Sequence, residues 1–435
     1  MPHGDADVPA VVGGGLRVPL VTGGHVAYAN LDHAASAPAL VAVRDAVERF
    51  LPYYASVHRG AGYASQVSTR AYEQSRDVVR RFVGGRPDDA VVFTRNTTDS
   101  LNLLEHCLPA GTHVVAFDTE HHADLLPWRR RPFTQLIAPA GPADAVAKVG
   151  LALSTLPRPA LVCVTGASNV TGELWPVAEI ARVARRYGAR VLLDAAQLLP
   201  HRDVDITALD VDYVAFSGHK LYAPYGAGAL VGRADWLVGA EPFLAGGGAS
   251  RSVEPGHVRW QDSPERQEAG SPNVVGAYAL AVACRTLEAA GRDRLARREE
   301  ELTARLRSGL ARVPGVTLLS LFGEDVPRVG TVAFAVRGWD SGKLAAVLSA
   351  EYGIGVRDGL FCAHLLTRRL LRRAGCDGSA VRASLGLGTT AEHVDRLVGA
   401  VTELVTEGPR CDYEIRDGRW APVGDTRTLP ELWPA

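Results

Sequence analysis

Short apolar runs alternate with helical patterns through the middle half of the chain, and this alternation limits the folds that are possible. Between the runs, residues 177–187 place apolar side chains at helical spacing, and Gly188 ends the pattern. Strands that are buried on both faces and linked by helices are typical of a mostly parallel sheet, so we expect an α/β fold. The predicted strands are Val91–Arg95, His113–Phe117, Leu161–Thr165, Arg190–Leu193, Tyr213–Phe216 and Ala229–Val231.

The pattern changes after about residue 280. A long Arg- and Glu-rich helix is predicted over 281–310, a strand over 331–336, and helices over 342–352 and 391–407. These elements indicate a smaller α+β domain, and a chain of 435 residues has room for two to three domains. The predicted divisions are an N-terminal extension (1–25), a large domain (26–280), a small domain (281–410) and an ordered C-terminal extension (411–435).

The charge balance and the cysteines exclude several classes of protein. Lys and Arg number 47 and Asp and Glu 48, so neither nucleic acid nor an anionic membrane is an expected partner. The 6 cysteines form no CxxC pair and no zinc-binding spacing, which predicts neither a disulfide framework nor a metal site. The chain begins without a secretory signal pattern, and no apolar run reaches the ~18 residues of a membrane span. A cytoplasmic location is therefore expected.

Polar side chains follow two of the predicted strands. Asp194 and Gln197 come after one strand, and Ser217, His219 and Lys220 come after a later one. Open α/β sheets bind ligands at the carboxyl ends of their strands, so these side chains are expected to converge on one site. A phosphorylated aldehyde cofactor needs an amine for a Schiff base and an acid for its ring nitrogen, and this set contains both.

With these residues, the chain resembles the class V, fold-type I enzymes that use pyridoxal 5'-phosphate (PLP), and most of all their cysteine desulfurase / selenocysteine lyase branch. The resemblance implies a homodimer whose large domain holds a mostly parallel, seven-stranded sheet between helices. The matching blocks run in family order over nearly the whole chain: LDHAASAP (31–38), SVHRGAGYAS (56–65), VVFTRNTTDSLNLL (91–104), EHHADLLPW (120–128), GASNVTGELWPV (166–177), LLDAAQ (192–197), FSGHKLYAPYGAGAL (216–230), EAGSPN (268–273), GVRDGLFCAH (355–364) and VRASLGLGTT (381–390).

The resemblance implies a role for each residue around the cofactor ring. Lys220 would form the Schiff base and later move a proton, and Asp194 would keep the pyridine nitrogen protonated so that the ring acts as an electron sink. His121 would stack on the ring and Gln197 would bond its phenolic oxygen. Asn169 would lie near that oxygen and the substrate carboxylate.

A second group would hold the phosphate. Thr97 and Thr98 follow a strand and open a helix, where free N–H groups and the helix dipole favour an anion. The resemblance adds Ser217 and His219 as further phosphate contacts. It also implies that Ser271 reaches the phosphate bound by the other subunit.

The substrate residues implied by the resemblance define the reaction. Arg382 would clamp the carboxylate of an amino acid with its planar fork, and Arg357 and His58 would line the pocket. Cys362 would attack the sulfur of bound cysteine, leaving alanine and a persulfide whose sulfur passes to an acceptor protein or thiol. This attack requires a thiolate, which Arg357 and His364 are candidates to favour.

Departures from the family pattern leave other PLP reactions open. Two histidines before Cys362 and a proline after it are missing, and Leu360 and Phe361 make the pocket mouth more apolar. Tyr225 stands where a small residue is common. An aminotransferase, an epimerase or a β- or γ-eliminating lyase of a biosynthetic pathway is therefore the alternative. A catalytically silent PLP-binding protein is a third possibility, against which intact Lys220, Asp194 and His121 argue.

Simpler structural roles compete with some of these assignments. Asp194 after a strand is also typical of a turn cap, and the pair Thr97–Thr98 is also typical of a helix cap. A single cysteine such as Cys362 is often an inert core residue. The adjacent His121 and His122 lack an acidic partner at ligand spacing, so they do not indicate a metal site.

Overall fold

A seven-stranded sheet forms the centre of the computed structural model, which describes residues 8–156 and 159–433. Residues 1–7 of the predicted N-terminal extension and 434–435 of the C-terminal one lie outside these ranges. β10 is antiparallel to both of its neighbours and all other pairs are parallel, which confirms the predicted α/β class. The strand order is β4 (Asp89–Thr94), β10 (Gly228–Arg233), β9 (Tyr213–Ser217), β8 (Arg190–Asp194), β7 (Ala160–Thr165), β5 (His113–Phe117) and β6 (Phe133–Leu136).

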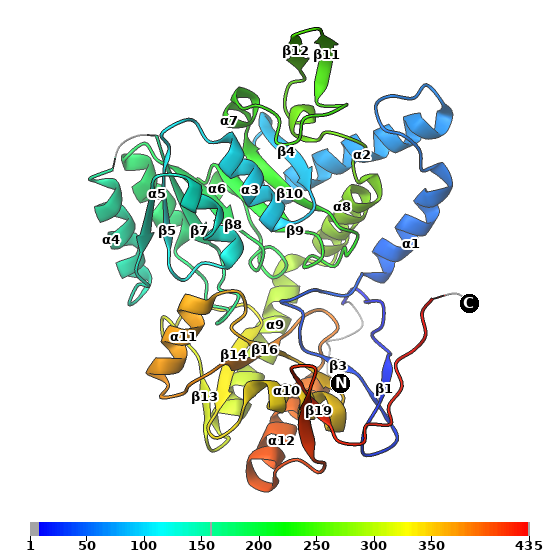
Figure 1. Ribbon diagram of the computed structural model, residues 1–435, viewed down its shortest axis with the longest axis vertical. Helices are drawn as coiled ribbons and strands as arrows, with labels where there is room; N and C mark the ends of the chain where they lie inside the picture. Colours follow the sequence, from blue (N-terminus) through cyan, green and yellow to red (C-terminus); the bar gives the residue numbers. More distant parts are fainter. Residues whose placement is uncertain (1–7, 157–158, 434–435) are drawn as a thin grey trace.

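Helices cover both faces of this sheet (Figure 1). Val114 packs in the core beneath α3 and α7, whereas Val115 packs in the core on the opposite face. This alternation buries both sides of each strand, which is why the strands read as continuous apolar runs. The helices of the large part are α1 (Val41–Phe50), α2 (Tyr63–Phe82), α3 (Thr97–Cys107), α4 (Pro142–Leu153), α5 (Val177–Arg186), α6 (Ile206–Leu209), α7 (Ala234–Gly239) and α8 (Val274–Ala289).

A second, antiparallel sheet lies in the lower part of the molecule in Figure 1. Its order is β13 (Val316–Leu318), β14 (Thr331–Val336), β17 (Ala380–Ser384) and β16 (Arg357–Gly359). A separate core, which includes Leu306, Phe334 and Leu397, joins this sheet to its helices. The boundaries at residues 280 and 410 stay predictions. The helices of this part are α9 (Arg292–Ala311), α10 (Ser341–Tyr352), α11 (His364–Arg373) and α12 (Ala391–Glu407).

The single long helix expected over 281–310 is wrong. The chain forms two helices there, α8 and α9, which are bent by 81° relative to each other. Gly291 lies between them with φ of 78°, a conformation that a residue without a Cβ adopts at little cost. Among the described residues, no single helix is both long enough and apolar enough to cross a bilayer, and α8 and α9 pass that test only as this bent pair.

Both chain ends pack on the small part of the molecule. β1 (Arg17–Pro19) and β2 (His25–Ala27) form an antiparallel pair, and β3 (Ala29–Asn30) pairs in parallel with β15 (Ile354–Gly355). At the other end, a hairpin of β18 (Tyr413–Arg416) and β19 (Arg419–Pro422) packs on α10. A further hairpin, β11 (Ser250–Glu254) and β12 (His257–Trp260), projects from the large part in Figure 1.

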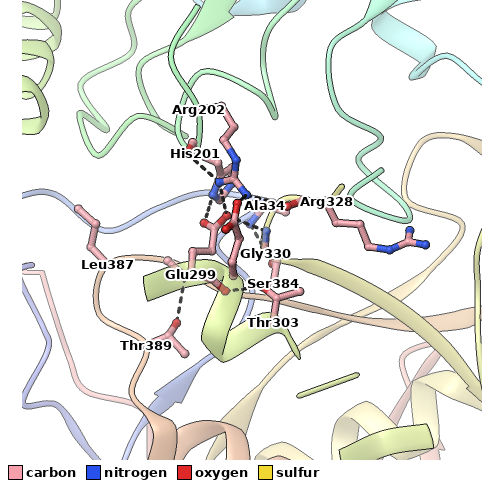
Figure 2. Close-up of polar contacts among 12 residues, drawn as sticks. Ala34, His201, Arg202, Glu299, Thr303, Arg328, Gly330, Ser384, Leu387 and Thr389 are labelled. Carbon is pink, nitrogen blue, oxygen red and sulfur yellow. Dashed lines mark hydrogen bonds and ion pairs between the residues drawn. The ribbon is translucent and has the colours of Figure 1, made fainter. Parts of the chain in front are cut away.

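A largely buried carboxylate links the two parts beside the loop after β8. Glu299 of α9 accepts hydrogen bonds from Arg202 and from the Gly330 amide, each at 3.0 Å, and contacts His201 Nδ1 (Figure 2). Burial alone would raise the pKa of Glu299, but His201 and Arg202 hold it below its ordinary value. Because removing one partner of a buried ion pair typically costs ~3–5 kcal/mol, this network fixes how the two parts meet.

Candidate active site

A cavity of about 340 Å³ opens at the carboxyl ends of β7, β8 and β9. The alternation of strands and helices puts these ends on one edge of the sheet, where α3 also begins. The cavity brings together every residue predicted to act on cofactor or substrate except Ser271 and His58: Thr97, Thr98, His121, Asn169, Asp194, Gln197, Ser217, His219, Lys220, Arg357, Cys362 and Arg382. His364, the other candidate to favour the Cys362 thiolate, begins α11 and does not line this cavity.

Lys220 and Asp194 line this cavity together and influence each other electrostatically. Asp194 and Ala215 are paired in β8 and β9, so the turn that carries Lys220 begins beside Asp194. Burial raises the pKa of Asp194, partly against the influence of Lys220. Burial likewise lowers the pKa of Lys220 to about 8, although Asp194 opposes this shift. Asp194 Oδ1 also accepts the Ala196 N–H at 2.9 Å, so Asp194 caps a turn and lines the cavity at once.

The lowered pKa predicts how covalent loading at Lys220 depends on pH. Only the neutral amine attacks an aldehyde, and roughly a tenth of an amine with a pKa of about 8 is neutral at pH 7, against less than about a thousandth at the ordinary pKa. The rate at which apoprotein acquires the absorbance of a PLP imine should therefore rise with pH and reach half its maximum near pH 8. A rate that keeps rising to about pH 10 would contradict the lowered pKa.

The first turn of α3 lies against the turn after β9. The Thr97 N–H donates to Ser217 Oγ at 2.8 Å, and the two hydroxyls lie 2.7 Å apart. Asn96 caps the helix by accepting the Asp99 N–H, so the threonine-cap interpretation is wrong and Thr98 is left exposed at the cavity. A helix N-terminus with two hydroxyls beside it suits a phosphate.

His121 and His219 face the cavity as neutral rings. Burial, with Lys220 as the next cause, lowers the pKa of His121 to about 3 and that of His219 to about 4. His121 Nδ1 accepts the Ala123 N–H at 3.0 Å, which assigns its proton to Nε2. A neutral imidazole held by its own backbone turn is suited to stacking on an aromatic ring.

Arg382 is buried and held from three sides. It donates to the Asn169 carbonyl at 2.9 Å and to Asp32 Oδ1 at 3.2 Å, and its guanidinium lies 5.2 Å from the centre of the Phe361 ring. Asn169 in turn donates to the Phe361 carbonyl at 2.7 Å. Arg382 Nε is buried and has no hydrogen-bonding partner among the residues that the structure describes. A carboxylate ligand would supply the missing acceptor.

Replacement of Arg382 by lysine tests this role. A lysine keeps the charge but loses the planar fork, so the amino acid substrate loses one charge-assisted hydrogen bond, which is worth ~1.5–3 kcal/mol. KM should rise about 10- to 100-fold, with a smaller change in kcat. Steady-state kinetics would measure this, with the exposed Arg305→Lys as the matched control. An unchanged KM would mean that Arg382 does not bind substrate.

Cys362 lies on a tight turn at the wall of the cavity. Phe361 and Cys362 both have positive φ, of 53° and 52°, and the Cys362 carbonyl accepts the His122 N–H at 2.7 Å. Cys362 is exposed, whereas Cys163 and Cys284 are buried in the core. The interpretation of Cys362 as an inert core residue is therefore wrong. Two adjacent residues in the left-handed region are a strained arrangement that often occurs at functional sites.

Two predicted residues do not reach this cavity. His58 Nε2 bonds Glu73 at 2.9 Å, and His58 lines a separate cavity of about 420 Å³ with Arg59, Gly270 and Pro272. Ser271 is exposed between the last two of these residues. Neither His58 nor Ser271 lines the main cavity of its own chain, so neither takes the role there that the resemblance implies.

Sequence reasoning did not assign a role to Asp32 or to two buried acids, Glu120 and Asp124, that interact electrostatically with Asp194. Glu120 and Asp124 flank the histidine pair in sequence; burial, together with repulsion among the acids that include Asp194, raises the pKa of both. The block EHHADLLPW displayed both acids, but only the fold shows that they are buried. Neither pKa is lowered by a lysine, as that of Asp194 is by Lys220.

The sheet topology and the site define the class of protein: an α/β enzyme with a half-buried lysine, a buried acid and a helix start suited to an anion at one cavity. Residues 29–397 match the family model described as Aminotransferase class-V. The chain belongs to this family of PLP-dependent enzymes, which confirms the recognised resemblance.

Similar proteins extend over most of the chain. A cysteine desulfurase of Dickeya dadantii (strain 3937) is 37% identical over 395 residues, covering 88% of this chain and 93% of the relative. A cysteine desulfurase of Salmonella agona (strain SL483) is 34% identical over 387 residues, covering 86% and 93%. The apo structure of cysteine desulfurase from Thermococcus onnurineus NA1 has a TM-score of 0.79 at 32% identity, covering 87% and 95%. The S-sulfonic acid form of an Escherichia coli cysteine desulfurase has a TM-score of 0.74 at 30% identity, with the same coverage.

The residues present fit the cofactor that the family implies. The volume of the cavity lies at the lower end of small-molecule sites, and its polar side chains include one amine, one buried carboxyl and two neutral imidazoles. The orphaned Nε of Arg382 provides an additional donor for an anionic substrate.

Proposed function

We propose that the chain is a PLP-dependent cysteine desulfurase, which converts cysteine to alanine and holds the released sulfur on Cys362. The observation that carries this proposal is the exposed Cys362 at the wall of the cavity that also contains Lys220 and Arg382. The printed names of the similar proteins support the same reaction.

The cofactor would be held by residues from several elements. Lys220 would attach it covalently, Asp194 and Gln197 would contact the ring, and His121 would stack on it. The start of α3, with Ser217 and His219, would bind its phosphate. When bound, PLP withdraws electrons from the Cα of the substrate and makes the proton there acidic.

The chain's own residues supply the remaining chemistry. Arg382 binds the substrate carboxylate, and Asn169, whose carbonyl fixes Arg382, orients the same end of the substrate. Lys220 Nζ, with its lowered pKa, exchanges a proton with the substrate Cα. The Cys362 thiolate attacks the substrate sulfur: the bond between that sulfur and Cβ breaks, a bond to Cys362 Sγ forms, and a proton replaces sulfur at Cβ.

The products formed from cysteine test the proposal. With cysteine and a reductant, the purified enzyme should release alanine and sulfide in equal amounts, measured by amino acid analysis and a sulfide assay. Pyruvate and ammonia would instead indicate elimination. A keto acid formed with an amino acceptor would indicate aminotransfer, and loss of optical activity would indicate epimerisation.

Phe361 is the specific observation that favours the alternative reactions. Its ring lines the cavity and lies under Arg382, which makes the wall more apolar beside the substrate carboxylate. Tyr225, the other departure from the family, packs at the edge of the core and does not line this cavity. Only one of the two departures therefore bears on the choice of substrate.

We also propose that the enzyme acts as a cytoplasmic homodimer. Ser271 and the cavity around His58 and Arg59 lie at the surface, away from the main cavity of their own chain. A second subunit would give them the roles that the family implies, with Ser271 at its partner's phosphate. The molecular mass in solution, measured by light scattering, tests this arrangement.

A further inference from the structure

A second cavity lies on the outer side of Cys362. Its volume is about 330 Å³, and it shares Thr98, His121, Ala123 and Cys362 with the main cavity. Cys362 therefore stands between the place where substrate would bind and a separate space that reaches the surface. The remaining lining residues of this outer cavity are Asn102, His122, Leu126, Pro127 and Arg130.

Cys362 is held in place by the backbone around it. Its carbonyl accepts the His122 N–H at 2.7 Å, and the next residue, Ala363, donates to the Leu360 carbonyl at 2.9 Å. Thr367 Oγ1 donates to the same Leu360 carbonyl at 3.2 Å. A cysteine on a turn with these bonds does not swing out to a distant partner, so an acceptor of its sulfur has to enter the outer cavity.

His122 lines the outer cavity together with Cys362 and is the candidate base for such an acceptor. Its Nε2 accepts the His364 N–H at 3.5 Å, which assigns the ring proton to Nδ1 and makes Nε2 the basic nitrogen. This bond is at the long limit for a hydrogen bond and would be given up when Nε2 takes a proton. The rings of His122 and His364 lie 4.4 Å apart at 70°. The charged or titratable groups facing His122 are His121, Cys362, His364 of α11 and Arg130, and Arg130 is paired with Glu105. Burial, followed by repulsion from His364, lowers the pKa of His122. No carboxylate lines this cavity among the described residues, so nothing there favours the charged ring.

We propose that the outer cavity receives the thiol that takes sulfur from Cys362, and that His122 accepts the proton of that thiol. This inference rests on the proposed desulfurase function. The acceptor thiol loses its proton to His122, and its sulfur attacks the outer sulfur of the Cys362 persulfide. The old S–S bond breaks, a new S–S bond forms on the acceptor, and Cys362 leaves as a thiolate that takes the proton from His122. No electrons are gained or lost overall.

The chemistry of the cavity fits a thiol from either of two sources. Its volume equals that of roughly ten water molecules at ~30 Å³ each, enough for a small free thiol or for one cysteine side chain with its neighbours. Leu126 and Pro127 provide an apolar edge, and Leu126 is 49% exposed. The experiment below distinguishes a free thiol from a protein cysteine.

The half-reaction after sulfur loading tests the proposal. Enzyme loaded with one equivalent of cysteine is mixed with dithiothreitol, with glutathione, or with a small protein that carries one exposed cysteine. Loss of sulfur from Cys362 is followed by mass spectrometry. His122→Asn should slow this step about 10²-fold with each acceptor, because a positioned base contributes ~10²–10⁴-fold. His106→Asn, a surface histidine outside both cavities, is the matched control and should transfer sulfur at the normal rate.

The pH dependence of the sulfur-transfer rate distinguishes a catalytic base at His122 from a residue with a purely structural role. In the unmodified enzyme the transfer rate should fall as pH decreases through the pKa of His122, because the protonated ring no longer accepts a proton. In His122→Asn this fall should disappear, and the rate should follow only the ionisation of the added thiol. Leu126→Trp, which narrows the outer cavity, should raise the thiol concentration needed for half-maximal rate without changing the pH profile.

The acceptor that saturates the transfer rate identifies the source of the thiol. Saturation by glutathione at low concentration identifies a free thiol, and saturation only by the protein cysteine identifies a protein; either result supports the proposal. Equal transfer rates for His122→Asn and the unmodified enzyme with all three acceptors would overturn it. Failure of the desulfurase proposal looks different, because then no alanine would form in the first turnover, before any acceptor is added.

Discussion

Lys220→Ala is expected to abolish both turnover and covalent attachment of the cofactor. The chain has three lysines, Lys148, Lys220 and Lys343, all in its described part, and only Lys220 lines the cavity. Its removal takes away the amine that binds the aldehyde and the group that moves the Cα proton, so kcat should fall at least about 10³-fold. The absorbance of the imine should disappear as well.

The small number of lysines makes this result easy to measure. Borohydride reduction of the loaded enzyme, followed by peptide mass spectrometry, should place the cofactor on the peptide that contains Lys220. Lys148→Ala is the matched control, because Lys148 lies on α4 in an ion pair with Asp144 and outside the cavity. If Lys220→Ala still formed an imine at another lysine and turned over normally, the assignment of the site would be wrong.

Local sequence signals predicted six of the seven strands of the main sheet and about half of the site residues; the edge strand β6 (Phe133–Leu136) was missed. The six strands could be predicted because most of their residues are buried on both faces, whereas the residues of β6 are only partly buried or exposed. The residues after the strands converge because parallel strands end on the same edge of the sheet. Asp194 and Lys220 are 26 residues apart in sequence, yet their strands are neighbours, with Asp194 paired to Ala215. The rule that neighbouring parallel strands end on the same edge of a sheet is therefore enough to predict that Asp194 and Lys220 lie close together.

Contacts between segments that lie far apart in the sequence could not be predicted from local patterns. Arg382 is paired with Asp32 across 350 residues and covers Phe361, and no local pattern connects these positions. The bend at Gly291 was missed because the apolar and charged residues on both sides continue a helical pattern, whereas a single positive φ ends α8. At the start of α3, three adjacent residues all suit an N-cap, and the backbone selects Asn96 over Thr97 and Thr98.

Ser271 and His58 lie outside the main cavity of their own chain for a different reason. Both were assigned from the resemblance, which describes an assembly, whereas the structure describes one chain. Ser271 is exposed and His58 lies in a cavity that the main site does not share. A residue that acts in a partner subunit leaves no signal in the contacts of its own chain, and an assembly measurement is needed to place it.

Cys362→Ala is expected to stop sulfur release from cysteine while the cofactor stays bound. Cys362 supplies the sulfur nucleophile, whereas the residues proposed to hold the cofactor are Lys220, Asp194 and His121 on other elements. The substitution adds no backbone strain, because alanine and cysteine both carry a Cβ and pay the same cost at a φ of 52°. Sulfide production should therefore fall by about 10³-fold or more with an unchanged imine spectrum, as expected when a covalent nucleophile is removed.

Cys411→Ala provides the control, since Cys411 lies beside Glu351 at the start of the C-terminal extension, outside both cavities that Cys362 lines. It should retain full sulfide production. Mass spectrometry of the unmodified enzyme after one equivalent of cysteine should show one added sulfur, located on the peptide containing Cys362. Full sulfide production by Cys362→Ala would contradict sulfur transfer to this residue and favour elimination, in which sulfide leaves without a protein nucleophile and pyruvate takes the place of alanine.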